Sequence, residues 1–279
     1  MRRLLLLVPV LLFGVLAGTA SANPAPAGGD RWALIVGVDH FEGATRPNFG
    51  ALADASNFRQ ALLRAGWADD HIKVLTDGSA RQADIRSGLQ WLVDHSSPTS
   101  LSVMHYSGHV KQVGSTEYLW PHDNRFIADT ELASSVRQLR GQAWIDISGC
   151  EAAGFDEGIS APNRLFTASS RSTEKSYEYP DLRQSVFSSL LIDRGMLQGQ
   201  ADTDGDHRVS VQEAFAYAAA RAPQITSAQR QGPQHPVLAG GDGTPLFLDA
   251  VAASPSSGPG PAPASRTASN KTCILFLCF

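Results

Sequence analysis

Two patterns of apolar and polar residues alternate along this chain. Continuous apolar runs are typical of strands buried on both faces of a sheet, and five such runs span 32–38, 72–77, 101–109, 142–148 and 164–170. Apolar residues spaced three or four positions apart predict amphipathic helices, which lie over 50–66, 85–92, 129–141 and 185–197. This alternation predicts an α/β fold in which helices cover both faces of a mostly parallel sheet.

The predicted helix boundaries have local signals of their own. Ser79 with Gln82 has the spacing of a capping box, which predicts that the second helix begins there. Gly66 suits the end of the first helix, and Gly141 suits the end of the third.

The first 22 residues have the pattern of a secretory signal peptide. The basic start MRR is followed by the apolar run LLLLVPVLLFGVLAG and then by the small residues Ala20-Ser21-Ala22. This predicts cleavage between Ala22 and Asn23, and a secreted or periplasmic protein with no membrane span in the mature chain. A membrane anchor is the alternative, although the apolar run is short for a span.

One folded domain is expected between two segments that cannot form a core. Residues 23–30 are a Pro/Gly linker, 31–250 hold all the predicted strands and helices, and 251–279 are a Pro/Ser/Gly/Ala-rich disordered tail with an apolar end. The 279 residues are 43% hydrophobic, which is enough for one sizeable core. The formal net charge of −4 gives no basic footprint, so we expect no nucleic-acid partner.

The positions of the three cysteines limit the roles that a thiol can have in the predicted domain. Cys273 and Cys278 lie in the tail, so Cys150 is the single cysteine of the predicted domain and cannot form a disulfide within it. Cys150 is then either a small packed side chain or a nucleophile. A nucleophilic thiol needs a nearby base, and His109 is the candidate, because both residues follow predicted strands whose carboxyl ends share one edge of the sheet.

Two short motifs in this order resemble the caspase-like cysteine peptidases, especially their bacterial and metacaspase-type members. The motifs are YSGHV around His109 and DISGCEAAGF around Cys150, after the opening WALIVGVDHF, and the resemblance covers most of 31–249. The separation of His109 from Cys150 is close to the roughly 50 residues typical of caspases. The resemblance implies a caspase-like three-layer sandwich that hydrolyses a peptide or protein substrate.

The resemblance also implies a role for residues near the motifs. His109 would be the general base, Cys150 would attack and form an acyl-enzyme, and the amides of Val110 and Cys150 would bind the oxyanion. Family members usually have Gly where this chain has Val110, and Asp, Gln or Glu where it has Ser148. The candidates for substrate contacts are Ser148, Asp146 and Glu178.

A further motif, ADTDGDHRVSVQEAF, has the spacing of an EF-hand-type calcium loop over 202–213. Calcium prefers several carboxylate and carbonyl oxygens supplied by a flexible loop. The expected ligands are Asp202, Asp204, Asp206, the Arg208 carbonyl, Ser210 and Glu213. His207 stands where the motif usually has Gly, so we expect a left-handed backbone there. Ser210 and Glu213 also have the spacing of a helix capping box, which is compatible with calcium binding.

The sequence therefore predicts a secreted cysteine endopeptidase with a His109–Cys150 dyad, a structural or regulatory calcium ion and no organic cofactor. One alternative is a catalytically inactive caspase-fold module that binds calcium. The other is a structural cysteine on a different fold.

Overall fold

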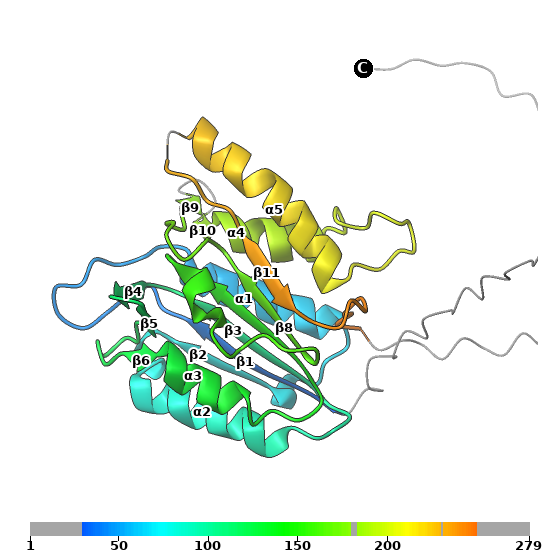
Figure 1. Ribbon diagram of the computed structural model, residues 1–279, viewed down its shortest axis with the longest axis horizontal. Coiled ribbons are helices and arrows are strands. Elements are labelled where there is room, and N and C mark those ends of the chain that lie inside the picture. The colour runs from blue at the N-terminus through cyan, green and yellow to red at the C-terminus, as the bar shows by residue number, and fades with distance from the viewer. Residues whose placement is uncertain (1–29, 180–182, 230, 250–279) are drawn as a thin grey trace, which may run out of the picture.

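A six-stranded sheet forms the middle layer of the protein. The computed structural model describes residues 30–179, 183–229 and 231–249 (Figure 1). The strand order is β11-β8-β7-β3-β1-β2. The strands that pair in parallel are Arg31–Gly37 (β1), Ile72–Thr76 (β2), Leu101–Ser107 (β3), Gln142–Ser148 (β7) and Arg164–Ala168 (β8), and Val237–Gly240 (β11) is antiparallel at one edge.

Helices cover both faces of this sheet. Side chains of β1 alternate between two cores, with Leu34 on one face and Ile35 on the other. The core that contains Leu34 packs against Gln82–His95 (α2) and Asp129–Val136 (α3). The core that contains Ile35 packs against Ala51–Arg64 (α1) and Val211–Ala228 (α5) (Figure 1). The predicted α/β fold with a mostly parallel central sheet is confirmed.

The shorter elements lie outside the six-stranded sheet. A three-stranded sheet contains Val110–Val113 (β4), Thr116–Leu119 (β5) and Ile127–Ala128 (β6), and a two-stranded one contains Glu178–Tyr179 (β9) and Gln184–Ser185 (β10). The predicted helix over 185–197 divides into Val186–Ser188 (α4) and the π-helix Ser189–Leu197 (η4). The 3₁₀ turns are Asp69–His71 (η1), Asp77–Ser79 (η2) and Ala152–Asp156 (η3).

The predicted start of the second helix at Ser79 is wrong. Ser79 lies in η2, where its side chain forms a capping box with Thr76. α2 begins at Gln82, whose amide donates to Oδ1 of Asp123 at 3.1 Å. The capping oxygen therefore comes from a loop distant in sequence, which the local spacing did not indicate.

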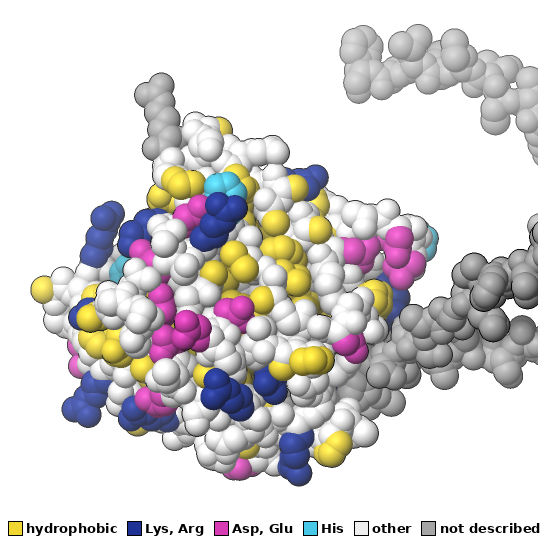
Figure 2. All heavy atoms as spheres, viewed as in Figure 1, with side chains coloured by type: hydrophobic (Ala, Val, Ile, Leu, Met, Phe, Trp, Pro, Cys, Tyr) yellow, Lys and Arg dark blue, Asp and Glu magenta, His cyan; other side chains and the backbone are white. Residues whose placement is uncertain are grey.

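The terminal predictions lie outside the described residues. These are the signal peptide over 1–22, the linker up to residue 29 and the tail over 251–279 with Cys273 and Cys278. Among the described residues, none of the helices is both long enough and apolar enough to cross a membrane. Acidic and basic side chains are interspersed on the face shown in Figure 2.

Candidate active site

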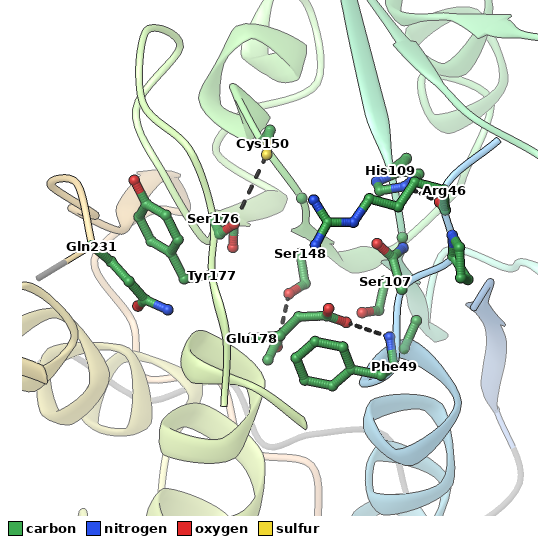
Figure 3. Close-up of a pocket in the computed structure, with 16 residues that line it drawn as sticks. Arg46, Phe49, Ser107, His109, Ser148, Cys150, Ser176, Tyr177, Glu178 and Gln231 are labelled. Carbon is green, nitrogen blue, oxygen red and sulfur yellow. Dashed lines mark hydrogen bonds between the residues drawn. The ribbon is translucent and has the colours of Figure 1, made fainter. Parts of the chain in front are cut away.

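Two neighbouring strand ends carry the predicted catalytic residues. β3 and β7 pair with Ser107 opposite Ser148, and the Gly108 amide donates to the Ser148 carbonyl at 3.1 Å. His109 and Cys150 each lie just beyond this pair, so the sheet brings them to the same edge. Both residues line one cavity of about 400 Å³ (Figure 3).

Gly149 allows the two strand ends to approach closely. A Cβ atom at this position would lie 2.9 Å from the Gly108 carbonyl oxygen and 2.7 Å from Cγ2 of Val110. Both distances are shorter than van der Waals contact. Only glycine therefore fits between the segment that carries His109 and the segment that carries Cys150.

Arg46 and Phe41 hold the His109 imidazole. Nε2 of His109 lies 2.8 Å from the Arg46 carbonyl oxygen, which can only accept, so Nε2 carries a hydrogen and Nδ1 has the free lone pair. The imidazole also stacks on Phe41, with ring centroids 4.9 Å apart. Burial is the main cause that lowers the pKa of His109. The imidazole is therefore neutral at neutral pH, and Nδ1 can accept a proton.

The Cys150 thiol is protonated at neutral pH. Burial raises its pKa, the nearby Glu151 carboxylate adds to this rise, and Lys175 opposes it. Sγ lies 3.9 Å from the Ser176 carbonyl oxygen, to which the thiol donates weakly. Because both groups are neutral and lie at the same edge of the sheet, the thiol proton is transferred during the attack, and no thiolate–imidazolium pair forms beforehand.

The Cys150 amide is a free donor next to the thiol. Among the described residues, this amide has no hydrogen-bond acceptor. Its neighbours differ: the Gly149 amide donates to Oγ of Ser169 at 2.9 Å, and the Glu151 amide donates to the Glu174 carbonyl at 2.8 Å. An unpaired amide beside a nucleophile can bind a developing oxyanion.

The Val110 amide, predicted as the second oxyanion donor, does not pair with the other strand of the hairpin formed by β4 and β5. The Trp120 amide donates to the His109 carbonyl at 3.2 Å, which makes His109 and Trp120 a hydrogen-bonded pair. Hydrogen-bonded and non-hydrogen-bonded pairs alternate in antiparallel strands, so Val110 and Leu119 form a non-hydrogen-bonded pair. The Val110 amide is thus directed away from β5.

Two of the predicted substrate contacts line the pocket. Ser148 lies at its floor, where the side-chain oxygens of Ser148 and Ser185 are 3.1 Å apart. Oε1 of Glu178 accepts from the amides of Phe49 and Gly50 at 3.0 and 2.8 Å (Figure 3). Burial raises the pKa of Glu178 despite these bonds. Glu178 therefore lines the pocket and also holds the backbone at the start of α1.

Asp146, the third predicted contact, does not reach the pocket, so this prediction is wrong. Its side chain is 0% exposed and lies on a buried face of the sheet. Asp146 accepts from Nδ1 of His105 at 2.7 Å and from Oγ1 of Thr167 at 2.5 Å. The period of a strand explains the error, because residues that share a face with Ser148 along β7 become buried away from the strand end.

A buried acid that sequence reasoning missed links the end of β3 to β10. Asp54 in α1 is 1% exposed, accepts from Oγ of Ser107 at 2.7 Å and accepts from the Ser185 amide at 3.2 Å. Burial raises the pKa of Asp54. The sequence did contain a signal that Asp54 is buried. Asp54 and Phe58 are four positions apart, so they share the apolar face of the predicted helix.

The acidic motif over 202–213 leads into the first turn of α5 and lies on the other side of the molecule from β4 and β5 (Figure 1). One carboxylate oxygen each of Asp202, Asp204 and Asp206 lie within 4.8 Å of one another. His207 has a φ of 65°, so the left-handed backbone expected at this position is confirmed. These three carboxylates are hard oxygen donors of the kind that calcium takes.

The other predicted ligands of this loop make hydrogen bonds or ion pairs. Glu213 and Ser210 form the expected capping box at the start of α5. Burial would raise the pKa of Glu213, but hydrogen bonds from Ser210 and Thr203 outweigh it and lower the pKa to about 2. The Arg208 guanidinium pairs with Asp249 at 2.8 Å.

Comparison with known proteins now gives the family. A family model described as the caspase domain matches residues 30–240. The chain belongs to the caspase-domain family. This caspase-domain protein is thus a member of a cysteine peptidase family, as the two motifs predicted.

Curated relatives of this caspase-domain protein are similar over shorter stretches. Metacaspase-1 of Eremothecium gossypii is 28% identical over 123 residues, which are 37% of this chain and 27% of that protein. Metacaspase-1 of Mycosarcoma maydis is 34% identical over 98 residues, which are 32% of this chain and 23% of that protein. The chain spans about a quarter of the length of these relatives.

Solved structures resemble the whole domain. Caspase-1 from Spodoptera frugiperda has a TM-score of 0.60 at 14% identity and covers 87% of this chain and 98% of its own. A protein from Geobacter sulfurreducens has a TM-score of 0.59 at 12% identity and covers 79% of this chain and 99% of its own. At these identities the likeness concerns the fold.

Proposed function

We propose that this caspase-domain protein is a cysteine endopeptidase whose dyad is His109 and Cys150. The observation that carries the proposal is the register of β3 and β7, which pairs Ser107 with Ser148 and leads both chemical groups into one cavity. The neutral imidazole with a free Nδ1 and the protonated thiol supply the base and the nucleophile that peptide hydrolysis needs.

The reaction begins with attack of the thiol on the scissile carbonyl. As the bond between Sγ of Cys150 and the carbonyl carbon forms, the thiol proton moves to Nδ1 of His109 and the carbonyl electron pair becomes an oxyanion. The amides of Cys150 and Val110 are the donors to that oxyanion. Collapse breaks the carbon–nitrogen bond, and His109 returns its proton to the leaving amine.

Water then hydrolyses the thioester. His109 takes one proton from the water, the oxygen bonds to the acyl carbon, and Sγ leaves and recovers the proton as a thiol. The Arg46 carbonyl keeps Nε2 of His109 protonated throughout, so Nδ1 is the atom that exchanges protons in both half-reactions. Protein and peptide substrates fit the open cavity, in which Ser148 and Glu178 would contact the substrate side chain.

We also propose that the loop over 202–213 binds a calcium ion. Asp202, Asp204 and Asp206 would hold it, with further oxygens from the Arg208 carbonyl, Ser210 and Glu213. The proximity of the three carboxylates and the left-handed His207 support this proposal. The ion would be structural, since it would connect the start of α5 to η4 at a distance from the pocket.

Export is the third part of the proposal. The basic start, the apolar run and Ala20-Ser21-Ala22 support a secreted or periplasmic protein that begins at Asn23 when mature. The N-terminal sequence of the protein recovered outside the cytoplasm tests this directly. A start at Asn23 supports export, and an intact Met1 in a membrane fraction contradicts it.

The peptidase proposal is tested by hydrolysis of a mixed fluorogenic peptide library. Purified protein from Asn23 onward is compared with Cys150→Ala and with Cys150→Ser, which keeps the size of the side chain. Cleavage by the wild type and its loss in both variants supports the proposal. Equal cleavage rates in all three proteins contradict it, and no cleavage by the wild type favours the inactive calcium-binding module.

A further inference from the structure

The peptide bond before Cys150 is held by two hydroxyl groups that lie behind it. Oγ of Ser169 donates to the Gly149 carbonyl oxygen at 2.8 Å, and Oγ of Ser170 donates to the same oxygen at 3.0 Å. Both serines directly follow Arg164–Ala168 (β8) and are 0% exposed. Gly149 and Cys150, in contrast, line the cavity (Figure 3). The two hydroxyls therefore contact this peptide from its buried side.

Each hydroxyl also accepts a hydrogen from an amide of the same turn. Oγ of Ser169 accepts from the Gly149 amide at 2.9 Å, and Oγ of Ser170 accepts from the Ala152 amide at 3.3 Å. A serine hydroxyl has one hydrogen and two lone pairs, so it can accept from an amide and donate to a carbonyl together. Because the amides occupy lone pairs, the hydrogens of both hydroxyls are directed to the Gly149 carbonyl.

This arrangement fixes the direction of the Cys150 amide. The carbonyl of Gly149 and the amide of Cys150 belong to one peptide group, and the described residues contain no cis peptide bond. A trans peptide group is planar, and its C=O and N–H point in opposite directions. Because the carbonyl is held on the buried side, the Cys150 N–H is directed to the side of the cavity.

Glycine at position 149 makes such a restraint necessary. The close approach to the Gly108 carbonyl excludes a Cβ atom at this position. Without a Cβ atom, glycine adopts backbone conformations that other residues avoid, so its own structure does not prevent rotation of the following peptide group. A rotated peptide group would point the Gly149 carbonyl at the cavity, where it would repel an oxyanion. The two hydroxyls oppose this rotation, because it would remove their shared acceptor.

We propose that Ser169 and Ser170 are positioning residues for the oxyanion donor of this peptidase. They hold the Gly149 carbonyl, and through the shared peptide group they keep the Cys150 amide directed at the carbonyl oxygen of the substrate. They act through this amide and do not touch the substrate. The inference rests on the proposed peptidase function and adds two buried residues to the dyad.

Removal of both hydroxyls is expected to lower kcat and to leave KM nearly unchanged. Ser169→Ala/Ser170→Ala leaves the Gly149 carbonyl without these two donors, so the peptide group can rotate. The loss of one oxyanion donor costs about 100-fold or more in kcat, and we expect a loss of about 100-fold in the double variant. Substrate binding is expected to persist, because the oxyanion forms only after the attack.

Two reagents that modify the same thiol separate this role from a general disturbance of the site. A peptide aldehyde adds the thiol across its C=O, so that Sγ of Cys150 bonds to the carbon and the thiol proton ends on the oxygen, which lies in the oxyanion position. Iodoacetamide reacts at a saturated carbon, from which sulfur displaces iodide, and no oxyanion forms. We expect the double variant to bind the aldehyde about tenfold more weakly. Its rate of alkylation at Cys150 in the alkaline range is expected to stay within about twofold of the wild type.

Both reagents are used in one assay, in which the aldehyde protects Cys150 from alkylation and mass spectrometry locates the adduct. Ser102→Ala is the matched control, because Ser102 is also 0% exposed and its Oγ has no hydrogen-bond partner among the described residues. This control is expected to keep kcat and the aldehyde affinity. Urea denaturation checks the fold of each variant. If the double variant does not fold, Ser170→Ala takes its place, with an expected loss of several-fold in kcat.

The outcomes separate this inference from the peptidase proposal. A folded double variant with the kcat and aldehyde affinity of the wild type overturns the inference and leaves the peptidase proposal in place. The same result for Ser170→Ala, where that variant is used, also overturns it. An equal fall in alkylation rate and aldehyde affinity overturns it as well, because the serines would then support the thiol. A wild type that neither cleaves peptides nor binds the aldehyde overturns both proposals.

Discussion

Nε2 of His109 donates to the carbonyl oxygen of Arg46 at 2.8 Å. This one contact decides which ring nitrogen can act as the base, because the other nitrogen, Nδ1, is left without a hydrogen. The Arg46 carbonyl therefore has the part of the third group that orients the base in other nucleophile–base pairs. A backbone carbonyl can orient the ring as a carboxylate does, and it adds no charge to the pocket.

The pH dependence of kcat/KM follows from the two neutral groups. Burial lowers the pKa of His109, so the base stays unprotonated below the pH at which an ordinary histidine becomes charged. Burial raises the pKa of Cys150, so the thiol loses its proton only above the pH of an ordinary thiol. We expect a broad bell, with its acid limb below the usual histidine range and its alkaline limb above the usual thiol range.

The rate of Cys150 alkylation by iodoacetamide checks this independently, because only the thiolate reacts. We expect slow alkylation of the free protein at neutral pH and a rise in the alkaline range, with Cys150→Ala as the control for the tail cysteines. Fast alkylation at neutral pH would indicate a preformed ion pair and would contradict the assignment of a neutral dyad.

Gly149→Ala tests the close approach of the strand ends. The added carbon would meet the Gly108 carbonyl oxygen at 2.9 Å, so the chain before His109 must move away from the chain before Cys150. A displacement of about 1 Å at a catalytic site can cost about 100-fold, and we expect a loss of that order in kcat/KM. Gly78→Ala, where the added carbon meets open space, is the control and keeps activity within about twofold. Equal activity of Gly149→Ala and the wild type would show that the approach does not matter.

Asp146→Ala tests the structural role of the buried pair with His105. Removing Asp146 leaves the imidazole buried without its hydrogen-bond partner, which we expect to lower the free energy of unfolding by about 3 kcal/mol. Urea denaturation measures this change, and Asp70→Ala, an exposed acid, is expected to change it by less than about 0.5 kcal/mol. A stable Asp146→Ala variant with altered substrate preference would contradict this structural role and would support Asp146 as a substrate contact.

The free energy of unfolding depends on pH in part through Glu213. Its folded pKa of about 2 is below the ordinary value of 4.5, so its contribution is fully present above 4.5 and is lost as pH falls toward 2. Urea denaturation at several acid pH values measures this loss. We expect Glu213→Gln to flatten the profile in that window, since the amide cannot titrate. The same slope in both proteins would contradict this.

Calcium binding by the 202–213 loop predicts a separate effect. We expect calcium to raise the thermal midpoint of the wild type by a few degrees relative to chelator, because a ligand that binds only the folded state stabilises it. Asp204→Asn removes one charge from the three carboxylates and is expected to abolish the shift. Asp94→Asn, an exposed acid in α2, keeps it. No shift in the wild type at millimolar calcium would contradict the calcium proposal.

The parts of the site that depend on long local patterns could be predicted from the sequence. The buried runs before His109 and before Cys150 are strong strand signals, and parallel pairing then brings the two residues to one edge. The capping box at Ser210 and the left-handed His207 also follow from local spacing.

The parts that depend on distant contacts could not be predicted in the same way. The Arg46 contribution is a backbone carbonyl, which leaves no mark in the sequence. Asp123, which caps α2, lies far from that helix along the chain. Asp146 was misassigned because its distance from the strand end, rather than its residue type, determines that it pairs with His105 on a buried face of the sheet. Such features require the fold before they can be assigned.

Covalent trapping tests the central claim most directly. The protein is incubated with a peptidyl acyloxymethyl ketone, whose carbon is captured by a cysteine that is activated in its substrate complex, and the adduct is located by peptide mass spectrometry. We predict one adduct on Cys150 in the wild type, at a rate that falls about 100-fold or more in His109→Gln, because the base is lost. No adduct on Cys150, or an equal rate in His109→Gln, would contradict the account.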